Sequence, residues 1–177
     1  KGTKKIQSLL VSLGGSSLAN EYVVMILKAI NRFEWQHKPR VDVVLGNRNY
    51  ISNIAELLPE FDCKIHTYVN NMWDFILKSD IAFGAGGTSI WERCCLGLPT
   101  IAIGVAENQR LSLERVHKVG GLYSLGCCKQ VSNEEINKAI SYLLSSNDNY
   151  SSMVNKSLNV CDGQGVNRVC QIMMSNT

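Results

Sequence analysis

The sequence predicts an α/β protein built on one doubly wound parallel sheet of about six strands. Short β-branched runs alternate with longer amphipathic segments along the 177 residues, and several of these runs end in glycine. Such alternation is typical of βαβ units, whose right-handed crossovers place helices on both faces of a parallel sheet. Hydrophobic residues make up 45% of the chain, which is enough for one sizeable core. We therefore expect a single domain, residues 1–177, with its ligand site at the carboxyl ends of the strands.

The first half of the chain has the pattern of three strands and two helices. Residues 6–15 are an apolar run that closes on two glycines, which predicts a buried strand. In residues 20–33 the apolar side chains recur at helical spacing, which predicts an amphipathic helix. A second strand, a short helix and a third strand are expected at residues 40–49, 50–60 and 63–69.

The second half continues the alternation and then becomes helical. Gly97 is placed to end one helix, and Ser132 with Glu135 has the spacing of a capping box that opens another. The expected strands lie at residues 80–87, 98–105 and 122–126. The expected helices lie at residues 71–79, 89–97, 108–120, 132–146, 147–160 and 162–175.

Composition excludes several classes of function. The formal net charge is +3 without a basic stripe, so we expect no nucleic-acid partner. No apolar stretch approaches the roughly 18 residues of a membrane-spanning helix, so we expect no membrane span. The chain starts at Lys1 rather than Met, which suggests that an upstream part of the protein is missing.

The seven cysteines form no Cys-x-x-Cys motif, which argues against zinc-finger and thioredoxin-like sites. They are interpreted as small buried residues of a protein from the reducing cytoplasm, which is the localisation we expect. The adjacent pair Cys127 and Cys128 leaves an alternative open, a redox or metal site.

The stretch AFGAGGTSIWERCCLGLPT, residues 82–100, has the strongest functional pattern. Glycines let a backbone approach a ligand closely, and the free N–H groups of the helix that Thr88 and Ser89 would open form an anion site. Glu92 lies one turn further along the helix, where a carboxylate can accept hydrogen bonds from the vicinal hydroxyls of a ribose. The pattern indicates a diphosphate and a ribose. The alternative is a tight strand-to-helix turn in which Glu92 only complements the helix dipole.

Two further loops follow expected strands. Gly14 and Gly15 precede Ser16 in a second glycine-to-helix junction, which matches neither the GxGxxG nor the P-loop pattern. Asn108 and Gln109 carry amides suited to the hydroxyl and N-acetyl groups of a sugar, although from these residues alone ordinary loop polarity and helix capping are the favoured explanation. No catalytic triad or metalloprotease motif is present, and the three histidines are interpreted as surface or packing residues. The sequence thus predicts a binding site without a catalytic residue.

Four segments together carry a resemblance to a known family: LVSLGGSS, VVLGNRN, VNNMWDFILKSDIAFGAGGTSIWERCCLGLPTIAIGVAENQ and DGQGVNRV. They resemble the C-terminal half of the UDP-2,4-diacetamido-2,4,6-trideoxy-β-L-altropyranose hydrolases of pseudaminic acid biosynthesis, which are related to spore coat polysaccharide biosynthesis proteins. More distantly they are similar to the UDP-N-acetylglucosamine transferase of peptidoglycan synthesis. The resemblance implies a GT-B fold, with two Rossmann-like domains and the nucleotide sugar between them.

The resemblance also implies roles for individual residues. Gly14, Gly15 and Ser16 would border the diphosphate. Gly46 and Asn47 would lie near the nucleoside, and Asn71 and Met72 would contact uracil largely through backbone. Glu92 would hold the ribose, and Asn108 and Gln109 would face the sugar. Phosphate at the helix start would contact Gly86, Gly87, Thr88 and Ser89.

The reaction that the resemblance implies is hydrolysis of the anomeric linkage, which releases UDP and the free sugar. The glycine–histidine motif with the family's proposed base belongs to an N-terminal domain, and this chain has no such motif. We therefore expect no catalytic residue here, no cofactor and no metal, and the missing N-terminal domain as a partner within the same polypeptide. The alternatives are the donor-binding domain of a GT-B glycosyltransferase that uses a UDP-sugar, and a regulatory module without catalysis.

Overall fold

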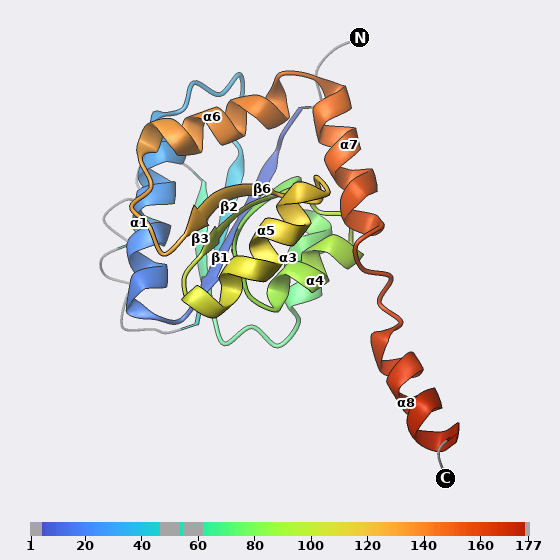
Figure 1. Ribbon diagram of the computed structural model, residues 1–177. Coiled ribbons are helices and arrows are strands. Elements are labelled where there is room, and N and C mark those ends of the chain that lie inside the picture. Colours follow the sequence, from blue (N-terminus) through green and yellow to red (C-terminus); the bar gives the residue numbers. More distant parts are fainter. Residues whose placement is uncertain (1–4, 47–53, 55–61, 176–177) are drawn as a thin grey trace.

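The computed structural model describes residues 5–46, 54 and 62–175, and it confirms the predicted sheet (Figure 1). All strand pairs are parallel, and the six strands lie in the order β3-β2-β1-β4-β5-β6. The order reverses between β1 and β4, which makes these two strands the switch point of the doubly wound sheet. The strands are β1 (Ser8–Gly14), β2 (Arg40–Leu45), β3 (Cys63–Thr67), β4 (Ile81–Ala85), β5 (Thr100–Gly104) and β6 (Tyr123–Cys127).

The helices follow the predicted sequence of elements with shifted ends. The first helix starts three residues earlier than expected, because the Ser16 hydroxyl caps it by accepting from the Ala19 N–H at 3.1 Å. The capping box of Ser132 and Glu135 is present. Apart from the buried Ile54, the helix expected at residues 50–60 lies outside the described residues. The helices are α1 (Ser17–Arg32), α3 (Met72–Lys78), α4 (Ser89–Cys95), α5 (Arg110–Lys118), α6 (Asn133–Leu144), α7 (Asn147–Leu158) and α8 (Gly165–Ser175).

The two faces of the sheet carry side chains of different size. Large residues of β1, β4 and β5, such as Leu9 and Phe83, pack with α1, α6 and α7 in the main core. On the other face, β4 and β5 present Ala82 and Ala102 to α3, α4 and α5. Figure 1 shows α1 and α6 on one side of the sheet and α3, α4 and α5 on the other. Small side chains under α4 let this short helix lie close to the strand that precedes it.

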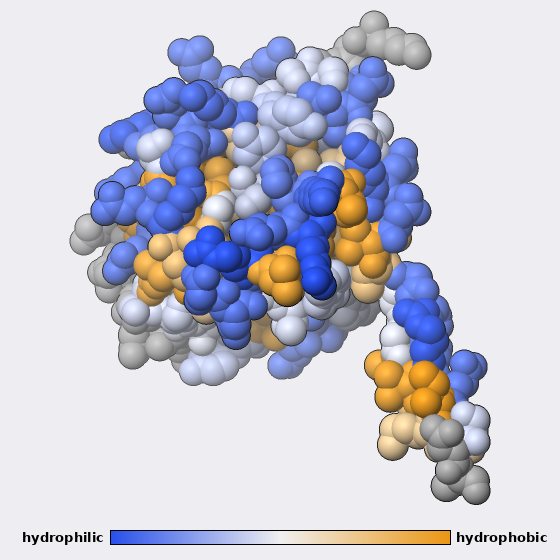
Figure 2. Space-filling view, viewed as in Figure 1, coloured by the Kyte–Doolittle hydropathy of each residue, from blue (hydrophilic) through white to orange (hydrophobic). Residues whose placement is uncertain are grey.

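The last helix, α8, extends away from the rest of the molecule (Figure 1), and none of its residues is buried. Its apolar side chains are open to solvent: Val166 is 74% exposed and Met173 is 69% exposed. The orange region near the end of this helix in Figure 2 is formed by such residues. Within the described ranges, no helix has the length and apolar character needed to cross a membrane.

Candidate functional site

The carboxyl ends of β1 and β4 bring the two glycine loops next to each other. Ser12 of β1 is the register partner of Gly84 in β4, so the loops that follow start side by side. The Gly86 N–H donates to the carbonyl of Ile103 at 2.9 Å, which ties the second loop to the end of β5. The predicted phosphate loops therefore share one edge of the sheet, at its switch point.

The first glycine loop packs backbone against backbone with the end of β2. A Cβ built on Gly46 would lie 2.8 Å from the Gly15 nitrogen, so no larger residue fits without a backbone shift. Gly14 has a φ of +96°, in the region that favours glycine. The structure thus places Gly14, Gly15, Ser16 and Gly46 together on the exposed edge. Asn47, which was predicted beside them, lies outside the described residues.

Gln109 lies against the second glycine loop. Its Oε1 accepts from the Val105 N–H at 3.0 Å, and its Nε2 lies 3.2 Å from the position that a Gly87 Cβ would occupy. The amide is therefore anchored in its own loop while its nitrogen faces the loop after β4. Asn108 precedes it in a short 3-10 turn and is exposed.

The start of α4 carries two exposed polar side chains, those of Thr88 and Glu92. Thr88 occupies the N-cap position without a capping hydrogen bond from its side chain, and it is exposed. Glu92 is exposed in the first turn, and among the described residues no side chain forms an ion pair or hydrogen bond with it. The exposed Glu92 carboxylate and the start of α4 thus follow directly after the second glycine loop.

Arg93 is the residue of this site that sequence reasoning missed. It is 2% exposed and is the largest fully buried side chain in the described part of the molecule. Its Nη1 donates to the Ser89 hydroxyl at 2.9 Å, and its Nη2 donates to the carbonyl of Ala85 at 2.7 Å. Burial lowers the pKa of the guanidinium to about 10, which leaves it charged at neutral pH. The spacing of four residues from Ser89 was the available signal, since such residues are neighbours on one helix face.

Gly84 has a different role from the one expected of the glycines in this stretch. A Cβ at this position would lie 2.4 Å from the Cζ of Arg93, and the φ angle is not in the left-handed region. The missing side chain makes room for the guanidinium rather than for a ligand.

Asn71 and Met72 lie at the start of α3, beyond the end of β3. Asn71 is exposed, whereas Met72 packs against the cluster of Leu10, Ile76 and Ala82. The Met72 side chain is therefore used in the core, which leaves its backbone as the group that can face a ligand.

The histidines hold structural positions. His66 lies in β3, and its Nε2 is 2.7 Å from Oδ1 of Asp42 in β2. His117 is exposed at the end of α5, with its Nδ1 3.1 Å from the carbonyl of Leu122. His37 lines a cavity of about 290 Å³ that opens beside Ile6 and Phe33, at the amino edge of the sheet. That cavity lies at the edge opposite the glycine loops.

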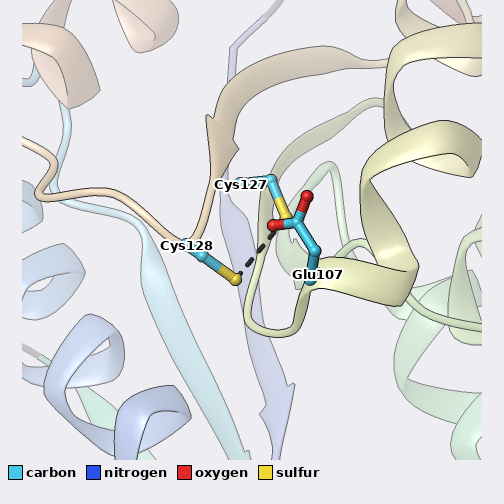
Figure 3. Close-up of side chains that lie close together, drawn as sticks. All are labelled: Glu107, Cys127 and Cys128. Carbon is cyan, nitrogen blue, oxygen red and sulfur yellow. Dashed lines mark hydrogen bonds between the residues drawn. The ribbon is translucent and has the colours of Figure 1, made fainter.

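A cluster of three potential metal ligands lies beside the end of β6. Figure 3 shows Glu107, Cys127 and Cys128 with their side chains turned toward one another, and their ligand atoms lie within 4.8 Å of each other. The two sulfurs are 3.7 Å apart. Two of the three groups also have a competing state: Arg110 Nη2 donates to Glu107 at 2.8 Å, and burial raises the pKa of the Cys127 thiol to about 11. An ion would have to displace the arginine and a thiol proton, so this geometry favours packing over metal binding.

The fold and the arrangement of its glycine loops define the class of domain to which the chain belongs. Six parallel strands in this order, with glycine loops at the switch point, form a Rossmann-like domain of the kind that binds nucleotides. Residues 9–165 match the glycosyltransferase family 28 C-terminal domain, and the chain belongs to this family.

Known proteins support this assignment. The chain is 25% identical over 174 residues to the spore coat polysaccharide biosynthesis protein SpsG of Bacillus subtilis (strain 168), covering 96% of the chain and 50% of that protein. The chain therefore spans about half the length of this curated relative. The expected likeness to spore coat polysaccharide proteins is confirmed.

Solved structures share the fold. MurG of Acinetobacter baumannii superposes with a TM-score of 0.76 at 13% identity, over 97% of this chain and 52% of that one. The UDP-GlcNAc 2-epimerase of Neisseria meningitidis, solved with UDP-GlcNAc bound, gives a TM-score of 0.76 at 14% identity, over 96% of this chain and 45% of that one. These likenesses confirm the Rossmann-like fold expected of the C-terminal domain of a GT-B protein.

Proposed function

We propose that this chain is the UDP-sugar-binding half of an enzyme of surface polysaccharide biosynthesis. The observation that carries the proposal is the meeting of two glycine loops at the switch point, with the exposed carboxylate of Glu92 one turn into α4. Inorganic phosphate would be repelled by that carboxylate, whereas a nucleoside diphosphate presents hydroxyls to it. The names of the relatives, which include UDP-sugar enzymes, agree with this ligand class.

Within the proposed complex each loop has a separate task. The backbone around Gly14, Gly15 and Gly86 borders the diphosphate, and Ser89 donates its hydroxyl to it. Glu92 accepts from the ribose hydroxyls, and Gln109 turns its amide nitrogen toward the sugar side. The donors near the diphosphate stabilise the charge that UDP gains when the anomeric bond breaks.

The finer proposal is hydrolysis of a UDP-linked diacetamido-trideoxyhexose, a step of nonulosonic acid biosynthesis such as that of pseudaminic acid. A water would attack C1, and a base from an N-terminal domain would take its proton. This domain would account for the other half of the length of the relatives. We further propose that it covers the apolar side chains that α8 exposes.

A second candidate is transfer of the sugar to an acceptor. Membership in a glycosyltransferase family favours it at least as strongly as hydrolysis. Both reactions would use the same donor site, and they differ in the group that attacks C1. A full-length protein incubated with the UDP-sugar separates them: free sugar formed without an acceptor supports hydrolysis, whereas UDP release that requires an acceptor supports transfer.

Calorimetric titration of this chain with UDP, CDP, ADP and NADH tests the ligand class directly. Selective binding of UDP is expected, with weakening in Glu92→Ala. Modest affinity is expected, because half of the cleft would belong to the other domain. Equal binding of all four ligands would contradict the proposal. The proposal would also be contradicted if UDP bound neither to this chain nor to the full-length protein.

A further inference from the structure

Arg93 is a buried cation that forms no hydrogen bond or ion pair with a carboxylate in the described part of the chain. Among the described residues its hydrogen-bond acceptors are the carbonyl of Ala85 and the hydroxyl of Ser89, and its Nε has none. A charged group whose hydrogen-bond partners are all neutral is costly to bury, and an apolar residue of similar volume often serves a core better. Packing alone therefore does not explain an arginine at this position.

The surrounding structure is shaped to accept the guanidinium. The Cζ and both terminal nitrogens of Arg93 occupy the space that a side chain at position 84 would fill. Each of these atoms would lie within 2.7 Å of a Cβ built on Gly84. Both hydrogen bonds go to the segment that links β4 to α4, which contains the second glycine loop. The positive charge is thus held directly beneath that loop.

The contact with Ser89 fixes the direction of a hydrogen bond. A hydroxyl has one proton to donate and two lone pairs that accept. Because Nη1 occupies a lone pair of the Ser89 oxygen, the hydroxyl proton is left to point elsewhere. The hydroxyl of the half-buried Ser89 therefore keeps its proton available for donation to another acceptor.

We propose that Arg93 is a positioning residue for the diphosphate, holding Ser89 as a donor and placing a positive charge behind the phosphate loop. This inference rests on the proposed function and deepens it. The ligand chemistry is that of a nucleoside diphosphate, and the charge acts from a position that solvent ions do not reach. Salt therefore screens this attraction less than it screens a surface arginine.

The test compares UDP with uridine, which lacks phosphate. Chemical-shift titration measures both affinities in wild type, Arg93→Met, Arg93→Lys and Ser89→Ala. Arg93→Met is expected to lower the UDP affinity at least tenfold and the uridine affinity less than twofold, at low and at high salt. Arg93→Lys should retain part of the preference for UDP. Arg32→Met is the matched control: it removes the same charge from the exposed end of α1 and should change neither affinity.

Ser89→Ala keeps the buried arginine in place and remains informative if Arg93→Met does not fold. It should lower the ratio of UDP to uridine affinity several-fold. Equal weakening of both ligands by folded Arg93 variants would overturn the inference, and so would an unchanged ratio in Ser89→Ala. If neither this chain nor the full-length protein binds UDP or uridine, the proposed function itself fails, and the inference fails with it.

Discussion

The sharpest prediction concerns the carboxylate of Glu92 and the ribose hydroxyls. In Glu92→Ala the proposed site loses an acceptor for two hydroxyl donors. A hydrogen bond to a charged group contributes about 1.5–3 kcal/mol, and the exposed position of Glu92 favours the lower value. Two such bonds give roughly 3 kcal/mol, which corresponds to about a hundredfold weaker binding of UDP.

The assay is calorimetry with UDP, 2′-deoxy-UDP and pyrophosphate. Wild type should bind 2′-deoxy-UDP about tenfold more weakly than UDP, because one hydrogen bond of roughly 1.5 kcal/mol is absent. In Glu92→Ala that difference should largely disappear, while the affinity for pyrophosphate should not fall. Glu92→Gln keeps the shape of the side chain and removes its charge. Glu114→Ala is the control, because it removes an exposed glutamate from α5.

One result would refute the ribose assignment. If Glu92→Ala binds UDP as wild type does and loses only stability, the carboxylate acts on the helix dipole, with an effect of about 0.3–1 kcal/mol. If pyrophosphate weakens together with UDP, the substitution has disturbed the phosphate loop instead.

Three further predictions concern the fold. Gly46→Ala should destabilise the chain by about 1–3 kcal/mol in urea denaturation, because its Cβ meets backbone at Gly15 2.8 Å away, whereas Gly165→Ala, with open space around it, should not. Ser132→Ala should lower the free energy of unfolding by about 1 kcal/mol, because the capping box is lost. Lys129 and the Ser132 N–H lower the pKa of its partner Glu135 to about 2. Thermal melts should therefore show a contribution of this carboxylate to stability above pH 4.5, which is lost as the pH falls toward 2. Deletion of residues 165–175 should leave the Tm of this chain unchanged, since α8 buries no residue; a large fall would show that the helix packs on the domain.

The sequence was sufficient to predict the sheet and most of its loops because local signals and topology agree. Glycine ends the β1 strand, Ser16 caps the helix after it, and parallel crossovers force the loops to one edge. What could not be predicted is which loops touch. The approach of Gly15 to Gly46 and of Gln109 to Gly87 depends on the twist and register of neighbouring strands, which no short stretch of sequence specifies.

Arg93 was missed for a related reason. An arginine is normally a surface residue, and here the space left at Gly84 makes its burial possible. Glu92 and Arg93 are consecutive, so on a helix they point about 100° apart. One is turned outward to solvent, and the other inward beneath the loop. One helical turn thus carries a buried cation and an exposed anion directly after the second glycine loop. In the proposed site the buried cation attracts the diphosphate and the exposed anion selects phosphates that carry a ribose. This combination would discriminate a nucleotide from free phosphate, which neither charge would do alone.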